Sequence, residues 1–141
     1  MKKIFYVILL LAAVFGAGSS GVAEEGRAES KIIAYYFHGS FRCITCTSME
    51  KYSREAIETN FKDALESGKL EFKSVNVEEP DNEHYADDYQ LYTKTLILSL
   101  VKNGEEIKSK NLDKIWEYAR NKQKFISYVA EELNNFLKEA Q

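Results

Sequence analysis

The residues with the clearest capacity for chemistry are two cysteines, Cys43 and Cys46, which are the only cysteines in the chain. They form a Cys-Ile-Thr-Cys motif between an apolar run typical of a strand and a pattern typical of a helix. Two thiols one turn apart at a helix start can close a disulfide with little movement, and the free N–H groups there favour a thiolate. This placement predicts a pair that cycles between dithiol and disulfide.

The two cysteines are expected to have different roles. Cys43 stands nearer the helix N-terminus, so we expect it to be more exposed and to be the attacking thiol. Cys46 lies one turn further in and is expected to be the buried, resolving thiol. Arg42 precedes Cys43 directly and should lower its pKa, although a solvated surface charge is the alternative. His38 could act in the same way or relay a proton, and a hydrogen-bonded structural histidine is the alternative.

Two other interpretations of the cysteine pair stay open. The chain could be a secreted, non-catalytic accessory module in which Cys43–Cys46 is a structural disulfide. It could also be a chaperone for copper or zinc that uses both thiolates and His38. A four-thiolate zinc site within the chain is excluded by the cysteine count, and the spacing of His38 and His84 fits no zinc finger. The oxidoreductase interpretation requires no metal and no cofactor.

Hydrophobic patterning indicates which elements position the motif. It predicts strands at 31–37, 70–77, 95–101 and 106–109, and helices at 43–67, after 81–82 with Tyr85, Tyr89 and Tyr92 on one face, and at 112–137 with a break at Asn121. Gly68 is expected just past the first helix, and Asn103-Gly104 is a strong hairpin signal. The first three strands could form βαβ units, and the hairpin adds an antiparallel edge. We therefore expect a single α/β domain over residues 31–138, with a mixed central sheet flanked by helices.

This layout resembles the thioredoxin superfamily. The strand–CxxC–helix unit, the later apolar strand and the hairpin Lys102-Asn103-Gly104-Glu105 carry the resemblance. It implies a three-layer thioredoxin-like fold with a reduced βαβαββα core, the family's first strand and helix being missing or reduced. The chain departs from the family in two places. Arg-Cys-Ile-Thr-Cys replaces the usual Trp-Cys-Gly-Pro-Cys, and the cis-proline that faces the dithiol is absent, with Thr93, Lys94 or Thr95 in its neighbourhood.

Further stretches support a narrower resemblance. They are Tyr36-Phe37-His38-Gly39, Phe41-Arg42-Cys43, Thr45-Cys46, Asn82-Glu83-His84, Tyr89-Gln90-Leu91-Tyr92-Thr93-Lys94 and Lys110-Asn111-Leu112-Asp113-Lys114-Ile115-Trp116. In them the chain is similar to a family of exported thioredoxin-like proteins labelled nitrophenyl compound nitroreductase subunit, ArsF type. The resemblance implies a part in reducing nitroaromatic compounds, as a dithiol subunit that passes electrons. Independent nitroreductase activity is not expected, because the sequence has no recognisable flavin-binding pattern.

The N-terminus has the pattern of a secretory signal peptide. Lys2 and Lys3 precede an apolar run over 4–15, and a zone of small residues follows and ends at Ala23. The run is too short for a comfortable membrane span, which needs about 20 residues. We expect cleavage after Ala23, a flexible leader at 24–30 and an extracytoplasmic, periplasmic or secreted protein with no stable membrane span. An uncleaved signal anchor is the alternative.

Charge and composition limit the classes of partner. The full chain has 141 residues, a net charge of −3 and a pI of about 5.5. Removal of residues 1–23 would take away two lysines and no acidic residue, which leaves the mature chain more acidic still. An acidic surface of this kind argues against nucleic-acid binding. We expect a monomer whose partner is a protein thiol or disulfide.

Overall fold

A computed structural model describes residues 30–140 of the chain. The predicted signal peptide and residues 24–29 of the predicted leader lie outside the described residues. In chain order the elements are β1 (Ser30–His38), α1 (Ile44–Asn60), α2 (Lys62–Glu66), β2 (Leu70–Asn76), the 3-10 helix η1 (Pro80–Asn82), α3 (His84–Asp88), β3 (Thr95–Lys102), β4 (Glu105–Asn111), α4 (Ile115–Tyr118) and α5 (Lys122–Glu139).

The four strands form one mixed sheet in the order β2-β1-β3-β4. Strands β1 and β2 are parallel and α1 connects them, whereas β3 is antiparallel to β1 and β4 is antiparallel to β3. The expectation that the third strand completes a second βαβ unit was wrong. The segment 77–94 stays at the end of the sheet where β2 finishes, so the chain re-enters the sheet from that end and β3 runs the opposite way. The order and directions are those of the expected reduced, thioredoxin-like βαβαββα fold.

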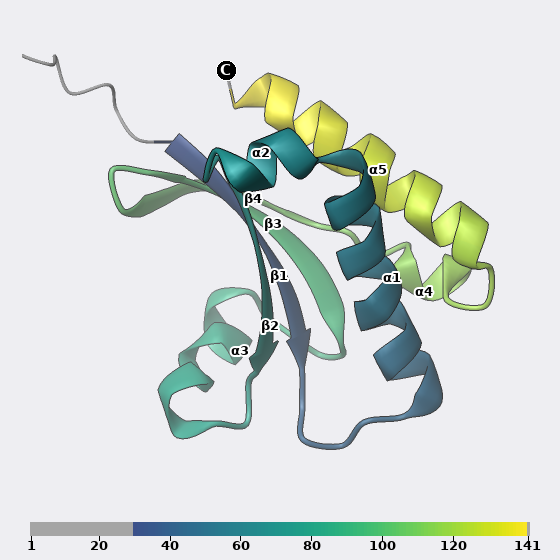
Figure 1. Ribbon diagram of the computed structural model, residues 1–141. Helices are drawn as coiled ribbons and strands as arrows, with labels where there is room; N and C mark the ends of the chain where they lie inside the picture. Colours follow the sequence, from purple (N-terminus) through teal and green to yellow (C-terminus); the bar gives the residue numbers. More distant parts are fainter. Residues whose placement is uncertain (1–29, 141) are drawn as a thin grey trace, which may run out of the picture.

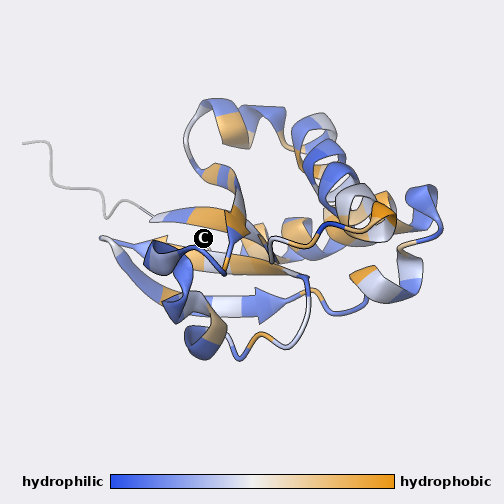
Figure 2. Ribbon diagram, turned by 90° about the horizontal axis from the view of Figure 1, so that it is seen from below, coloured by the Kyte–Doolittle hydropathy of each residue, from blue (hydrophilic) through white to orange (hydrophobic). Residues whose placement is uncertain are grey.

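The sheet is the middle of three layers. Helices α1 and α5 cover one face, and α3 lies on the other (Figure 1). Strand β1 has apolar side chains on both faces because successive residues alternate. Ile32, Ala34 and Tyr36 join the larger core under α1 and α5, and 33, 35 and 37 join a smaller core on the opposite face. The central strands are accordingly hydrophobic along their length (Figure 2).

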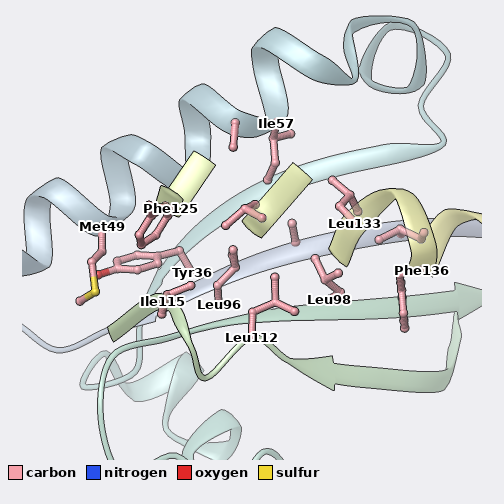
Figure 3. Packing of buried hydrophobic residues seen from close by; sticks show 14 of the residues in the cluster. Tyr36, Met49, Ile57, Leu96, Leu98, Leu112, Ile115, Phe125, Leu133 and Phe136 are labelled. Atoms are coloured by element: carbon pink, nitrogen blue, oxygen red, sulfur yellow. The ribbon is translucent and has the colours of Figure 1, made fainter. Parts of the chain in front are cut away.

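The larger core holds α1 against the sheet. Its side chains fill the space between α1, α5 and strands β1 and β3 (Figure 3). Met49 and Ile57 reach down from α1, and Phe125 and Leu133 reach in from α5, all of them fully buried. The packing fixes the orientation of α1, whose first turn carries the cysteine pair.

The smaller core is rich in aromatic rings. Tyr85 and Tyr89 pack against Tyr35 and Phe37, with ring centroids 5.1–6.4 Å apart. Tyr92 does not share this face as the spacing had predicted. Helix α3 ends at Asp88, so Tyr92 lies in the following loop with 95% of its surface exposed.

Several helix boundaries differ from the sequence prediction, and two features of the helix ends agree with it. The helix predicted from Leu112 begins only at Ile115. The helix predicted for 43–67 is interrupted at Phe61, where φ is −131°, so α1 and α2 are separate. Gly68 follows α2 with a φ of +72°, the conformation expected of a glycine at this place. The predicted break at Asn121 is confirmed, since its side chain caps α5 by accepting from the Lys124 N–H at 3.0 Å.

The hairpin between β3 and β4 has the predicted Asn-Gly turn. Asn103 and Gly104 both have positive φ, 54° and 85°, as a turn matching the strand twist requires. Strand β4 is longer than the predicted 106–109. Ser30 pairs with Lys102 in the sheet, and α5 continues to Glu139. In the part of the chain that the structure describes, no helix has the length and apolar character needed to cross a membrane.

Candidate active site

The cysteine pair lies where the loop after β1 enters α1. Cys43 and Cys46 form a disulfide, with their Cα atoms 5.0 Å apart. Cys43 is the N-cap residue of α1, and its Sγ accepts a hydrogen bond from the Cys46 N–H at 3.1 Å. A sulfur in this position faces the unpaired N–H groups of the first turn, which stabilise negative charge on it. The strand–CxxC–helix placement expected from the sequence is therefore present.

The two cysteines differ in solvent exposure as the sequence predicted. Cys43 is half-buried, whereas Cys46 has only 2% of its surface exposed. Tyr36, fully buried on β1, donates a hydrogen bond from its hydroxyl to the Cys46 carbonyl at 2.7 Å. This bond ties the first turn of α1 to the sheet and keeps Cys46 facing inward.

The loop that delivers Cys43 is fixed by the segment after β2. The Ser40 N–H donates to Glu78 Oε2 at 3.0 Å, and Asn76 Nδ2 donates to Ser40 Oγ at 3.1 Å. The hydrogen bonds from Ser40 lower the pKa of the Glu78 carboxyl. A Cβ on Gly39 would lie 2.4 Å from Glu78 Oε1, so glycine allows this close approach. The loop thus has a defined path toward the disulfide.

Arg42 is placed differently from what its position beside Cys43 suggested. Its guanidinium pairs with Glu50, one turn after Cys46 on α1, and both side chains are partly buried. Burial by itself would raise the pKa of Glu50, but hydrogen bonds from Ser74 and Arg42, with the positive charge of Arg42, outweigh it and hold that pKa below its usual value. The positive charge predicted beside Cys43 is therefore paired with a carboxylate of α1.

His38 lies at the end of β1 and bonds to the loop backbone. Its Nδ1 donates to the Gly39 carbonyl at 2.9 Å. This contact matches the structural alternative that the sequence left open, in which the histidine stabilises the turn.

Thr95 is buried at the start of β3, with its hydroxyl donating to Asn111 Oδ1 at 2.6 Å. It pairs with Phe37 in the sheet, so its side chain lies on the face that α3 covers, opposite the disulfide. Its observed contact joins β3 to β4.

Exposed apolar side chains near the disulfide were not singled out from the sequence. Phe41 and Ile44 are 74% and 87% exposed and flank Cys43 in the chain, and Trp116 is 40% exposed. The Trp116 indole donates to the Lys94 carbonyl at 2.8 Å, and Lys94 Nζ lies 5.8 Å from the Phe41 ring centroid. We call Phe41 and Ile44, which lie close to Cys43 in the chain, the apolar rim. The sequence feature that could have indicated this surface is the presence of two large apolar residues beside Cys43 at the end of a strand.

The metal-chaperone alternative requires side chains that together could bind an ion. Among residues 30–140, no group of three or more histidine, cysteine or acidic side chains is arranged to hold a metal.

Comparisons with known proteins give structural likenesses only. No family model and no curated protein matches this chain. Among solved structures, a Fasciola hepatica thioredoxin is 22% identical over 64% of this chain and 79% of its own, with a TM-score of 0.34. The oxidised thioredoxin of Plasmodium falciparum is 17% identical over 68% and 82%, with a TM-score of 0.39.

A thioredoxin of Entamoeba histolytica is 22% identical over 59% of this chain and 71% of its own, with a TM-score of 0.36. At these identities and scores the likenesses carry no functional argument, and the fold class rests on the strand order and connections of this chain. The comparisons lend no support to the narrower resemblance to the ArsF-type family.

Proposed function

We propose that the protein is a thiol–disulfide oxidoreductase that works through Cys43 and Cys46. The observation that carries the proposal is the disulfide at the N-terminus of α1, in which the half-buried Cys43 sulfur accepts the Cys46 N–H. A helix N-terminus lowers a thiol pKa and makes the thiolate available near neutral pH. The difference in burial between the two cysteines suits an attacking and a resolving role.

The proposed reaction is a two-step exchange. In the dithiol form the Cys43 thiolate attacks a partner disulfide; a bond forms between Cys43 and one partner sulfur, and the other partner sulfur leaves as a thiolate. Cys46 then loses its proton to solvent and attacks Cys43 Sγ, which closes the Cys43–Cys46 disulfide and releases the second partner thiolate. Two electrons pass from the protein to its partner, and the reverse sequence oxidises a partner dithiol.

A polypeptide partner is supported by the surroundings of Cys43. The apolar rim presents large side chains beside a sulfur that is partly accessible. Exposed aromatic and aliphatic groups of this kind bind apolar segments of another chain by removing area from water. We propose that a monomer of this protein docks a protein disulfide or dithiol here. We further propose that it can serve as an electron-passing subunit of a reductase system.

A redox titration tests whether the Cys43–Cys46 pair is redox-active. We expect a single two-electron transition between about −120 and −270 mV when the purified protein is equilibrated in glutathione or dithiothreitol buffers. A maleimide gel shift reports the thiol state. A potential below about −300 mV would instead mark a structural disulfide, and the accessory-module interpretation would replace the oxidoreductase.

Export of the protein is proposed from the N-terminal sequence. Lys2 and Lys3, the apolar run at 4–15 and the small residues up to Ala23 fit a cleaved signal peptide, and a disulfide suits an oxidising compartment. We expect the protein expressed with its full N-terminus to be recovered outside the cytoplasm, and intact mass spectrometry to show a chain that begins at Glu24. Recovery of the uncleaved chain in the membrane fraction would favour the signal-anchor alternative.

A further inference from the structure

The Arg42–Glu50 ion pair joins residues that lie on either side of the cysteine pair in the chain. Arg42 immediately precedes Cys43, and Glu50 follows Cys46 by four residues on α1. Positions 43, 46 and 50 share one face of the helix, because their spacings of three, four and seven residues bring side chains to the same side. The carboxylate is therefore within two helical turns of both sulfurs.

The surroundings of Glu50 keep it charged and in place. Its side chain is 19% exposed and that of Arg42 is 28% exposed, so solvent screens the pair only in part. Besides Arg42, the Ser74 hydroxyl from β2 and the charge of His38 from β1 favour the ionised carboxylate. Tyr36 of β1 also interacts with the charges of Arg42 and Glu50. Across the loop, the carboxylate of Glu78 interacts with the positive charges of Lys94 and His38. The loop therefore has a second group of opposite charges on that side.

We propose that Glu50 is a positioning residue that offsets the charge of Arg42 and so sets the thiolate content of Cys43. This inference rests on the proposed function, since it concerns how strongly the same thiol is activated. An unpaired Arg42 would act on the thiolate with the field of a full positive charge. Paired with Glu50, it acts as part of a dipole, whose field falls off faster with distance and stabilises the thiolate less. The helix N-terminus is then the main source of thiolate stabilisation, and Arg42 and Glu50 largely cancel.

The proposal predicts opposite effects for the two single charge removals. One full charge within two helical turns changes a pKa by about one unit at an effective dielectric constant of about 20–40. Glu50→Gln should therefore lower the Cys43 pKa by about one unit and Arg42→Gln should raise it by about one unit. The double variant should stay within about 0.3 units of the wild type. For Glu50→Gln, the equilibrium with glutathione should shift toward the dithiol by up to tenfold, which is about 30 mV.

The pKa is measured on the reduced full protein from the pH dependence of iodoacetamide alkylation of Cys43, with urea unfolding as a check on folding. Glu58→Gln is the matched control, because it also removes an acidic charge from α1 but lies three turns beyond Cys46, paired with Arg54. It should leave the pKa unchanged. If Arg42→Gln does not fold with Glu50 unpaired, Glu50→Gln and the double variant still decide the question.

Two results would overturn the proposal. One is a Cys43 pKa that does not move in Glu50→Gln protein, and the other is a double variant shifted as far as Arg42→Gln alone. Both would mean that Arg42 acts independently of its partner. The wild-type redox titration separates this outcome from failure of the proposed function, because a structural disulfide would show a potential below about −300 mV whatever the variants do.

Discussion

Protein carrying Cys46→Ser is expected to accumulate covalent complexes with its partners. Cys43 is half-buried beside the exposed Phe41 and Ile44, so a partner sulfur can reach it, whereas Cys46 is 2% exposed. Without Cys46 the mixed disulfide on Cys43 has no internal thiol to resolve it, and its lifetime becomes that of slow attack by external thiols. The expected change is from no detectable complex to stable complexes on non-reducing gels, which dithiothreitol releases.

Cys43→Ser is the matched control for the trapping experiment. This variant retains only the thiol of Cys46, which is buried in the first turn of α1. We therefore expect few or no complexes to form. Equal trapping by the two variants, or trapping by neither, would contradict the assigned roles. Mass spectrometry of the released partners also bears on the finer proposal, since a reductase component among them is what an electron-passing subunit requires.

Phe125→Ala is expected to produce the largest loss of stability. Phe125 is fully buried on α5, and its ring packs edge-to-face with that of Tyr52 on α1, with centroids 5.6 Å apart. It lies between α5, α1 and the sheet (Figure 3). Truncation of a buried phenylalanine to alanine costs about 3–5 kcal/mol, from lost burial and from the cavity that remains. Urea unfolding monitored by circular dichroism should show this decrease in the free energy of unfolding.

The control for this substitution is Ile107→Ala on β4, where the side chain is 58% exposed. Exposed substitutions of this kind change stability by about 0.5 kcal/mol or less. A loss below about 1 kcal/mol for Phe125→Ala would show that α5 does not close the larger core. The packing of α1, and with it the position of Cys43, would then depend on other contacts.

Much of the framework was predictable because it depends on short-range signals. The apolar run of β1, the glycine at 68, the Asn103-Gly104 turn and the break at Asn121 each depend on the local backbone, and all were found where expected. The placement of Cys43 and Cys46 at the start of α1 follows from the same local patterns. The expected difference in their exposure was also found, because the first turn of a helix packed on a sheet has one face inward.

The features that the sequence did not predict depend on which segments meet in space. The break at Phe61 divides the predicted helix, and Tyr92 lies outside the aromatic cluster because α3 ends early. The antiparallel direction of β3 follows from where the segment 77–94 re-enters the sheet. None of these is encoded in a local periodicity of 2.0 or 3.6 residues.

The amino-acid sequence by itself determined that this protein has a CxxC pair at a strand–helix junction in an α/β domain, because residue spacing and helix-end chemistry are local properties. Only the tertiary structure decided what surrounds that pair. It paired Arg42 with Glu50 and placed Thr95 on the opposite face of the sheet. It also brought the carboxylate of Glu78 close to the loop at Gly39. Electrostatic and hydrogen-bonding partners are set by distances between segments, and these distances exist only once the sheet and helices have packed.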